Sequence, residues 1–140
     1  MKLTYADVTE GTEIAPVSYP VSRLSLIRYA GASGDFNVIH WNERVARSVG
    51  LPTVIAHGMY TMAQAGKFVT EWVGDPGAVT DFGVRFSAMV PVPDDDEGAT
   101  LEVSGKVLEK LADNKVTVDI VVKAGGAKVL TRARATVRLP

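Results

Sequence analysis

The segment from His57 to Gly74 restricts the possible folds most, because it predicts a long helix with very little polar surface. Its polar side chains fall on one narrow arc, and most other positions are apolar or small. The arc consists of Thr61, Gln64, Lys67 and Glu71. At about 1.5 Å per residue the helix would span roughly 24 Å, the width of a small domain. We therefore expect it to be buried on most sides, with another layer wrapped around it.

After Gly74 the pattern changes from helical to alternating, which indicates strands. They are predicted over residues 78–90, 99–111, 115–124 and 127–139, with a further strand near 12–20. The pairs at 113–114 (Asp-Asn) and 125–126 (Gly-Gly) favour hairpin turns. One face of the last strand is expected to hold Val129, Thr131, Ala133, Ala135, Val137 and Leu139. A buried helix followed by an antiparallel meander predicts an α+β fold, with the sheet wrapped around the helix in one domain over residues 1–140.

Composition excludes several classes of function. The 140 residues include 15 Lys and Arg against 16 Asp and Glu, a net charge of −1, so we expect neither nucleic acid nor an anionic membrane as a partner. The absence of cysteine excludes disulfides, thiolate nucleophiles and cysteine-ligated zinc. No phosphate-loop or dinucleotide motif occurs, so no cofactor and no metal is expected.

The start of the chain and the edges of the sheet suggest where the protein works and in what form. The first residues lack the apolar core of a signal peptide, and no stretch approaches the length of a membrane span. We therefore expect a cytoplasmic protein. An open sheet leaves unpaired strand edges, and pairing across a two-fold axis would cover them, so we also expect a dimer.

The stretch GASGDFNVIHW, residues 31–41, gathers Asp35, Asn37 and His40 among small and apolar residues. On a helix, at about 100° per residue, the aspartate and the histidine would lie roughly 140° apart. Their convergence therefore requires an irregular turn, which Gly34 and Asn37 suit. Short helices are predicted on both sides, one capped by Ser22 and one by Asn42.

The segment from Tyr29 to Ala46, YAGASGDFNVIHWNERVA, resembles the signature of the (R)-specific enoyl-thioester hydratases and dehydratases, the MaoC-like hot-dog proteins. Matching positions are Ser33, Gly34, Asp35, Asn37, Ile39, His40 and Ala46. Val38 stands where the signature has proline, a difference that affects the rigidity of the turn. A second block, IAHGM, places Gly58 at the expected distance. The segments HGMYTM and WVGDPGAVTDFGVRFSAMVPVP look like the B-subunit branch of the mycolate-type (3R)-hydroxyacyl-acyl-carrier-protein dehydratases.

The resemblance implies a hot-dog fold and reversible dehydration of (3R)-hydroxyacyl thioesters to trans-2-enoyl thioesters in fatty-acid metabolism. It implies an acyl thioester of acyl carrier protein or coenzyme A as substrate, and a homodimer or a heterodimer with a related hot-dog subunit. Asp35 and His40 would act as acid and base, in an order that the residues leave open. Apolar neighbours are expected to bury the Asp35 carboxyl and so help it to hold a proton. Asn37 would hold the turn or orient the carboxylate.

Gly58 is the candidate for the thioester oxygen. The long helix is expected to begin near Gly58 without a Ser, Thr, Asp or Asn cap, which leaves its first N–H groups free at the positive end of the helix dipole. Because glycine has no Cβ, a carbonyl group can approach closely. We therefore expect an oxyanion site at the start of this helix.

Other features have simpler interpretations. His57 is expected to hydrogen-bond the backbone, and Met59, Met62, Phe68 and Trp72 to belong to the core. Residues 93–98 (PDDDEG) predict a solvated loop rather than a calcium site, and Arg132, Arg134 and Arg138 a solvent-facing strand rather than a phosphate site. Two other functions stay open. A thioesterase would use a helix carboxylate, for which only Glu71 near the far end is available, and a non-catalytic partner subunit would not need the Asp35–His40 pair.

Overall fold

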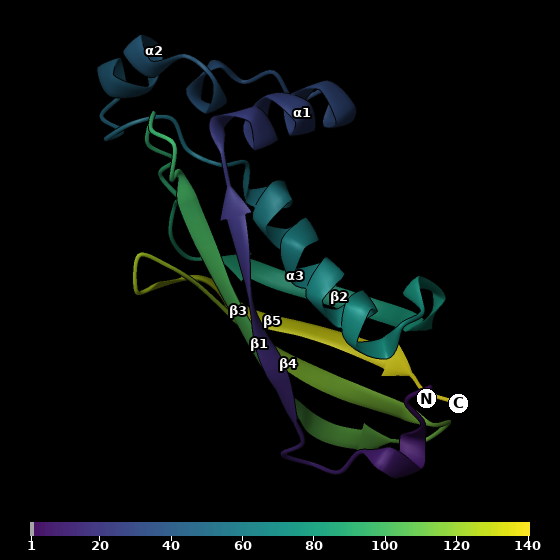
Figure 1. The fold of residues 1–140 in the computed structure, drawn as a ribbon. Coiled ribbons are helices and arrows are strands. Elements are labelled where there is room, and N and C mark those ends of the chain that lie inside the picture. Colours follow the sequence, from purple (N-terminus) through teal and green to yellow (C-terminus); the bar gives the residue numbers. More distant parts are fainter. Residues whose placement is uncertain (1) are drawn as a thin grey trace.

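The computed structural model describes residues 2–140 and contains one five-stranded antiparallel sheet that curves around the long helix α3 (Gly58–Val73), as Figure 1 shows. The strand order is β1-β3-β4-β5-β2. The strands are β1 (Glu13–Val21), β2 (Val79–Phe86), β3 (Ala99–Leu111), β4 (Lys115–Ala124) and β5 (Ala127–Arg138). The predicted α+β architecture, with the sheet wrapped around a helix, is confirmed.

Helices α1 (Arg23–Ser33) and α2 (Glu43–Ser48) lie together at one end of the molecule, next to the start of α3 (Figure 1). Both predicted caps are present: Ser22 accepts a hydrogen bond from the Ser25 N–H, and Asn42 accepts one from the Val45 N–H. Three short 3-10 helices complete the structure, η1 (Tyr5–Asp7), η2 (Val38–His40) and η3 (Pro76–Ala78). The predicted turn around residues 35–40 therefore lies between α1 and α2.

The sheet is a meander only over β3, β4 and β5. Their turns are as predicted, with positive φ at Asp113 and Asn114 (58° and 56°) and at Gly125 and Gly126 (56° and 80°). The prediction that the first strand after α3 continues this meander is wrong, because β2 pairs with β5 and β1 pairs with β3.

The predicted strand over 78–90 also ends early, at Phe86. After Phe86, the Ser87 and Ala88 N–H groups still donate to the Val129 carbonyl of β5, at 3.0 and 3.4 Å. Val90 then bonds to the segment that precedes α3, because its carbonyl accepts from the Ala56 N–H at 2.9 Å. Residues 87–90 thereby form part of the surroundings of the α3 N-terminus.

A bulge in β5 changes which of its residues face the core. Thr131 and Arg132 together lie opposite a single residue of β4, and Arg132 has φ 47°. Thr131 is exposed and Leu130 is buried, so the prediction that Thr131 faces inward is wrong. Strict alternation predicted the other inward positions correctly: Val129, Ala133, Ala135, Val137 and Leu139.

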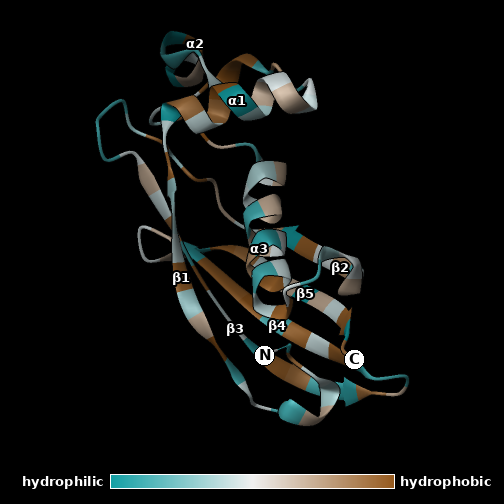
Figure 2. Cartoon of the chain, turned by 45° about the vertical axis from the view of Figure 1, so that its right-hand side comes forward, coloured by the Kyte–Doolittle hydropathy of each residue, from teal (hydrophilic) through white to brown (hydrophobic). Residues whose placement is uncertain are grey.

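The core lies between the sheet and one side of α3. Figure 2 shows hydrophobic residues recurring along the strands of the sheet. Phe68 is 2% exposed. Its ring packs so closely against Gly105 that a Cβ added to this glycine would lie 3.0 Å from the ring. The opposite side of α3 is open: Met59, Lys67 and Glu71 are exposed, whereas Thr61 is buried. The predictions that α3 is buried on most sides, that Thr61 belongs to its polar arc and that Met59 belongs to the core are therefore wrong for the single chain.

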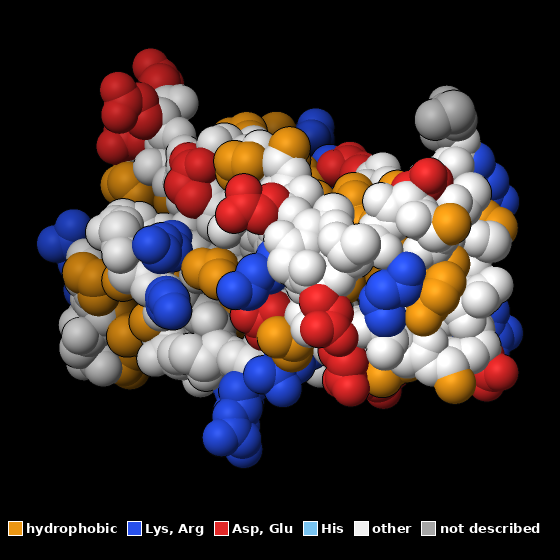
Figure 3. All heavy atoms as spheres, turned by 90° about the horizontal axis from the view of Figure 1, so that it is seen from below, with side chains coloured by type: hydrophobic (Ala, Val, Ile, Leu, Met, Phe, Trp, Pro, Cys, Tyr) orange, Lys and Arg blue, Asp and Glu red, His pale blue; other side chains and the backbone are white. Residues whose placement is uncertain are grey.

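The surface carries charges of both signs, which lie interspersed on the face drawn in Figure 3. Asp94–Glu97 and the three arginines of β5, Arg132, Arg134 and Arg138, are exposed, as expected for solvated segments. Among residues 2–140, no helix is both long and apolar enough to span a bilayer. β1 and β2 form the two edges of the sheet.

Candidate active site

A cavity of about 380 Å³ opens beside the N-terminus of α3. Its lining is mainly apolar and includes residues from α3, β2 and β5 and from the segments before and after them. The residues used below are His40, Gly58, Thr61, Phe86, Val129 and Leu130. An apolar cavity with a few polar groups at one end is the usual form of a small-molecule site.

The turn before the cavity is built by short-range hydrogen bonds. α1 ends at Gly34, which has φ 76° and donates its N–H to the Ala30 carbonyl. The Asn37 N–H then donates to Oδ1 of Asp35 at 3.1 Å, and the Ile39 N–H donates to Oδ1 of Asn37 at 3.3 Å. The irregular turn is confirmed. Of the two predicted roles of Asn37, this geometry matches that of holding the turn, since its side chain caps η2.

His40 enters the cavity from this turn and is 8% exposed. Its Nδ1–H donates to the Ile55 carbonyl at 2.7 Å, which leaves Nε2 as the ring nitrogen available to a substrate. Burial lowers the pKa of His40 below its ordinary value. The hydrogen bond to the Ile55 carbonyl raises the pKa, but by less than burial lowers it. The imidazole is therefore neutral at pH 7 and able to accept a proton.

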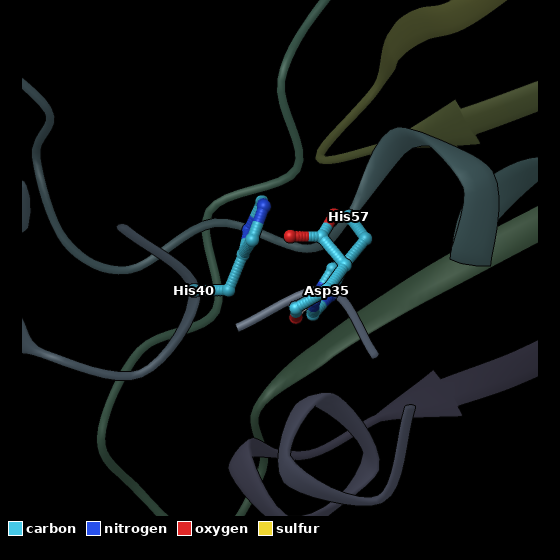
Figure 4. A group of neighbouring side chains, drawn as sticks. All are labelled: Asp35, His40 and His57. Carbon is cyan, nitrogen blue, oxygen red and sulfur yellow. Dashed lines mark hydrogen bonds between the residues drawn. The ribbon is translucent and has the colours of Figure 1, made fainter. Parts of the chain in front are cut away.

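Asp35 lies close to His40 but is not buried. Its carboxylate is directed toward the His40 ring in Figure 4, and ligand atoms of Asp35, His40 and His57 lie within 4.8 Å of one another. The predicted convergence of Asp35 and His40 is confirmed. The predicted burial of the Asp35 carboxyl is wrong for the single chain, because the turn that carries it lies at the surface.

His57 is the third member of this group and is 2% exposed. Its Nε2–H donates to the backbone carbonyl of Asp35 at 3.1 Å, so the predicted bond to the backbone is present. Its ring also stacks on His40, with ring centroids 3.7 Å apart and 22° between the planes. Nitrogen lone pairs lie in the ring plane, so two stacked imidazoles do not converge on one metal ion.

The first turn of α3 has no side-chain cap, as predicted. Its backbone bonds begin with the N–H groups of Tyr60 and Thr61, which both donate to the His57 carbonyl, so those of Gly58 and Met59 have no acceptor within the helix. The space beside Gly58 is not empty, since a Cβ there would lie 3.0 Å from the Phe86 ring. Phe86 is 54% exposed at the end of β2.

Sequence reasoning assigned only His40 and Gly58 of the cavity lining to the site, and Thr61 and Phe86 are the two missed residues that lie nearest to Gly58 along the chain or in space. Thr61 is 3% exposed and lines the cavity one helical turn after Gly58, a spacing that the sequence contains. Phe86 reaches the cavity through the pairing of β2 with β5, which the sequence does not reveal.

Glu43 ties the helices around the site together. Its carboxylate accepts hydrogen bonds from Thr53 (2.8 Å), Arg47 (2.9 Å) and Arg23 (2.8 Å). These bonds, led by the one from Thr53, lower the pKa of Glu43 to about 2. Arg23 belongs to α1 and Thr53 lies two residues before Ile55, so Glu43 fixes α1 and α2 against the segment that anchors His40.

Glu71, the carboxylate considered for thioester hydrolysis, lies near the other end of α3. It accepts a hydrogen bond from the Tyr19 hydroxyl at 2.7 Å and lies 3.6 Å from Nζ of Lys67. It is not among the residues that line the cavity.

Comparison with known proteins identifies the family. Residues 6–125 match the MaoC like domain. A solved MaoC-like dehydratase is 41% identical, with a TM-score of 0.95 over 99% of this chain and 43% of its own. The R-hydratase PhaJ1 from Pseudomonas aeruginosa is 27% identical, with a TM-score of 0.86 over 99% of this chain and 86% of its own.

Curated relatives are much longer than this chain. The 3-hydroxyacyl-thioester dehydratase X of Mycobacterium tuberculosis is 44% identical over 66 residues, which make up 47% of this chain and 22% of that protein. Matches to this dehydratase and to four fatty acid synthase β subunits cover 3% to 22% of the relatives' lengths. Because residues 6–125 match the family model, the chain belongs to the MaoC like domain family. It has the hot-dog fold of the hydratases and dehydratases that it matches.

Proposed function

We propose that this chain is a single hot-dog domain over residues 1–140 that catalyses the reversible dehydration of (3R)-hydroxyacyl thioesters to trans-2-enoyl thioesters, in the fatty-acid metabolism of the cytoplasm. The observation that carries the proposal is the position of Asp35 and His40 beside both an apolar cavity and the uncapped start of α3. Addition of water to an enoyl thioester needs three elements: groups that hold the water and transfer its proton, an acyl site, and donors for the thioester oxygen.

In the hydration direction, water lies between the Asp35 carboxylate and Nε2 of His40. The neutral His40 accepts one proton from the water as its oxygen bonds to the β-carbon of the enoyl group. The imidazolium then returns a proton to the α-carbon, which restores the neutral ring and completes the addition of one water molecule. Asp35 accepts a hydrogen bond from the second hydrogen of the water and stabilises the imidazolium electrostatically.

During this step negative charge develops on the thioester oxygen. The N–H groups of Gly58 and Met59, which have no acceptor within the helix, are placed to donate to that oxygen. Phe86 must move away from Gly58 to admit the thioester, which its exposed position at the end of β2 permits. Asn37 keeps the turn in shape through its bond to the Ile39 N–H.

The substrate is an acyl thioester of acyl carrier protein or coenzyme A, with its acyl chain in the cavity walled by Val129 and Leu130. A second hot-dog chain, identical or related, would pair with the free edge of the sheet and cover the open side of α3, where Met59 is 56% exposed. Such a partner would also shield Asp35, which the single chain leaves exposed.

The direct test is hydration of trans-2-enoyl-CoA substrates of short and medium chain length, with the product resolved on a chiral column. We expect (3R)-hydroxyacyl-CoA from the native protein and a loss of turnover of at least about 10²-fold in Asp35→Asn and in His40→Ala. Asp96→Asn, the same chemical change in an exposed loop, is the matched control and should keep native turnover. Release of free coenzyme A thiol would identify thioester hydrolysis instead. Native turnover in folded Asp35→Asn would remove Asp35 from the proposed mechanism.

A further inference from the structure

We propose that His57 is a positioning residue for the Asp35–His40 pair, and that its Nε2–H, rather than its bulk, is the reason for a histidine at this position. The inference rests on the proposed hydration reaction, in which His57 transfers no proton itself. It assigns a role to a side chain that sequence analysis treated as a simple backbone contact.

Two histidines join the turn at residues 35–40 to the segment at residues 55–57, each donating a hydrogen bond from its own segment to the other. His40, at the end of the turn, donates from Nδ1 to the Ile55 carbonyl at 2.7 Å. His57, just before α3, donates from Nε2 to the Asp35 carbonyl at 3.1 Å. The Ile55 N–H also donates to the Ile39 carbonyl at 3.3 Å. The turn at 35–40 and the strand-like segment at 55–57 therefore fix each other, and the proposed oxyanion donors follow directly after His57.

The ring of His57 is held between two other rings. His40 stacks on one side, at 3.7 Å between centroids, and Tyr29 of α1 meets it edge-on at 4.8 Å and 64°. These rings keep His57 from rotating. The orientation of His40 is set by its own Nδ1–H bond to the Ile55 carbonyl, which does not depend on the stack. Packing of this kind could be supplied by phenylalanine.

Nδ1 of His57 distinguishes histidine from phenylalanine. This atom is buried and has no hydrogen-bond partner among residues 2–140. A buried acceptor without a partner is unfavourable, and a phenylalanine of similar shape would avoid it. A phenylalanine would also lose the donor to the Asp35 carbonyl. The unpartnered Nδ1 is thus the consequence of keeping Nε2–H, whose target is the backbone of a catalytic residue.

Two variants separate the donor from the ring. His57→Phe keeps an aromatic ring against His40 and loses the donor, whereas His57→Gln keeps an N–H that can reach the Asp35 carbonyl and loses the ring. If the donor positions Asp35, His57→Phe should lower kcat by roughly 10- to 100-fold, the effect of misplacing a reacting group by about 1 Å, with KM little changed. His57→Gln should retain kcat within about threefold of the native value, since its donor is preserved.

A second readout needs no substrate. The Asn37 N–H donates to the Asp35 carboxylate, so its hydrogen exchange reports whether the turn is intact. We expect exchange at Asn37 to be faster in His57→Phe than in the native protein and unchanged in His57→Gln. Thermal unfolding of the same samples identifies a variant that fails to fold. If His57→Phe fails, a native kcat in His57→Gln still supports the donor and a large loss overturns it. If His57→Gln fails, the kcat of His57→Phe decides, since a loss supports the donor and a native value overturns it.

The outcomes are decisive in each case. Native kcat in folded His57→Phe, or an equal loss of kcat in both variants, would overturn the assignment to the Nε2–H donor. If the native protein does not hydrate enoyl thioesters, the proposed function fails, and exchange at Asn37 still decides whether His57 holds the turn. Loss of kcat in His57→Phe with retention in His57→Gln would support the proposal.

Discussion

The two ends of α3 are built in opposite ways. At its C-terminus Val73 is 3% exposed, and Gly74 closes the helix with φ 75° and a bond from its N–H to the Thr70 carbonyl at 2.8 Å. At its N-terminus the cap position is His57, which makes no cap bond, and Met59 is 56% exposed. Phe68 and Val69 anchor only the C-terminal half in the core.

Within this one helix, the C-terminal end serves stability and the N-terminal end serves the proposed reaction. An absent N-cap costs about 1 kcal/mol of helix stability, and the free N–H groups that result are also what an anionic oxygen requires. The closed end contributes packing and contains no residue of the proposed reaction. Substitutions at the C-terminal end should therefore change stability, whereas substitutions at the N-terminal end should change turnover.

Phe68→Ala should have the largest effect, on stability alone. Removing a fully buried aromatic side chain is expected to lower the free energy of unfolding by about 3–5 kcal/mol, since the ring fills the space beside Gly105. Turnover per folded molecule should stay native. Urea denaturation and a rate normalised to the folded fraction measure the two quantities. A fall in normalised turnover would show that the closed end is coupled to the reaction.

Gly58→Ala and Gly66→Ala form a matched pair along the same helix. An added Cβ would meet a β2 phenylalanine ring at both positions, Phe86 at 3.0 Å from Gly58 and Phe82 at 3.2 Å from Gly66. We expect Gly58→Ala to lower kcat by about tenfold, part of the roughly 3 kcal/mol that one oxyanion donor provides, whereas Gly66→Ala should not change it. Steady-state kinetics on both variants make the comparison. Equal effects on kcat would mean that crowding against β2, rather than the thioester site, is responsible.

The pH dependence of kcat/KM should reflect the buried imidazole at the open end. Burial lowers the pKa of His40 from its ordinary value of 6.5, so the neutral, proton-accepting form persists at lower pH. At pH 6.5, kcat/KM should therefore exceed half of its plateau value, and it should fall only as the pH passes down through the lowered pKa. A rate profile at constant ionic strength tests this. A midpoint at or above 6.5 would contradict the assignment of His40 as the proton acceptor.

Glu71→Gln should have the smallest effect. The Glu71 carboxylate is half exposed and bonds the Tyr19 hydroxyl, so its loss should reduce stability by less than about 1 kcal/mol. Burial and this carboxylate raise the pKa of Tyr19, which should fall in the variant. Urea denaturation measures the stability, and ultraviolet titration of tyrosine measures the pKa of Tyr19. The hydration rate should stay native, and a release of free coenzyme A thiol that disappears in Glu71→Gln would favour the thioesterase interpretation.

Local patterns predicted the parts of the fold that depend on neighbouring residues. The inward side chains of β5 after its bulge, the turns at Asp113 and Gly125 and the cap at Ser22 each depend on a few consecutive residues. The partner of β2 and the inward position of Leu130 depend on pairing across the sheet, which short-range patterns do not contain.

The candidate site divides in the same way. The convergence of Asp35 and His40 and the uncapped helix start followed from local sequence, because a turn and a missing cap are local features. The exposure of Asp35, the stack of His57 on His40 and the Phe86 ring beside Gly58 join segments far apart in the chain. Only the folded structure brings these groups together.

The bulge at Thr131 and Arg132 shifts the register of β5 against β4 by one residue. Residues 133–138 supply the core beneath α3, while Val129 and Leu130 form a wall of the cavity. A change of side chain at residue 129 or 130 acts on the cavity wall and on the packed core together, because both side chains belong to both. The volume of the cavity and the stability of the fold are thus linked at these two positions.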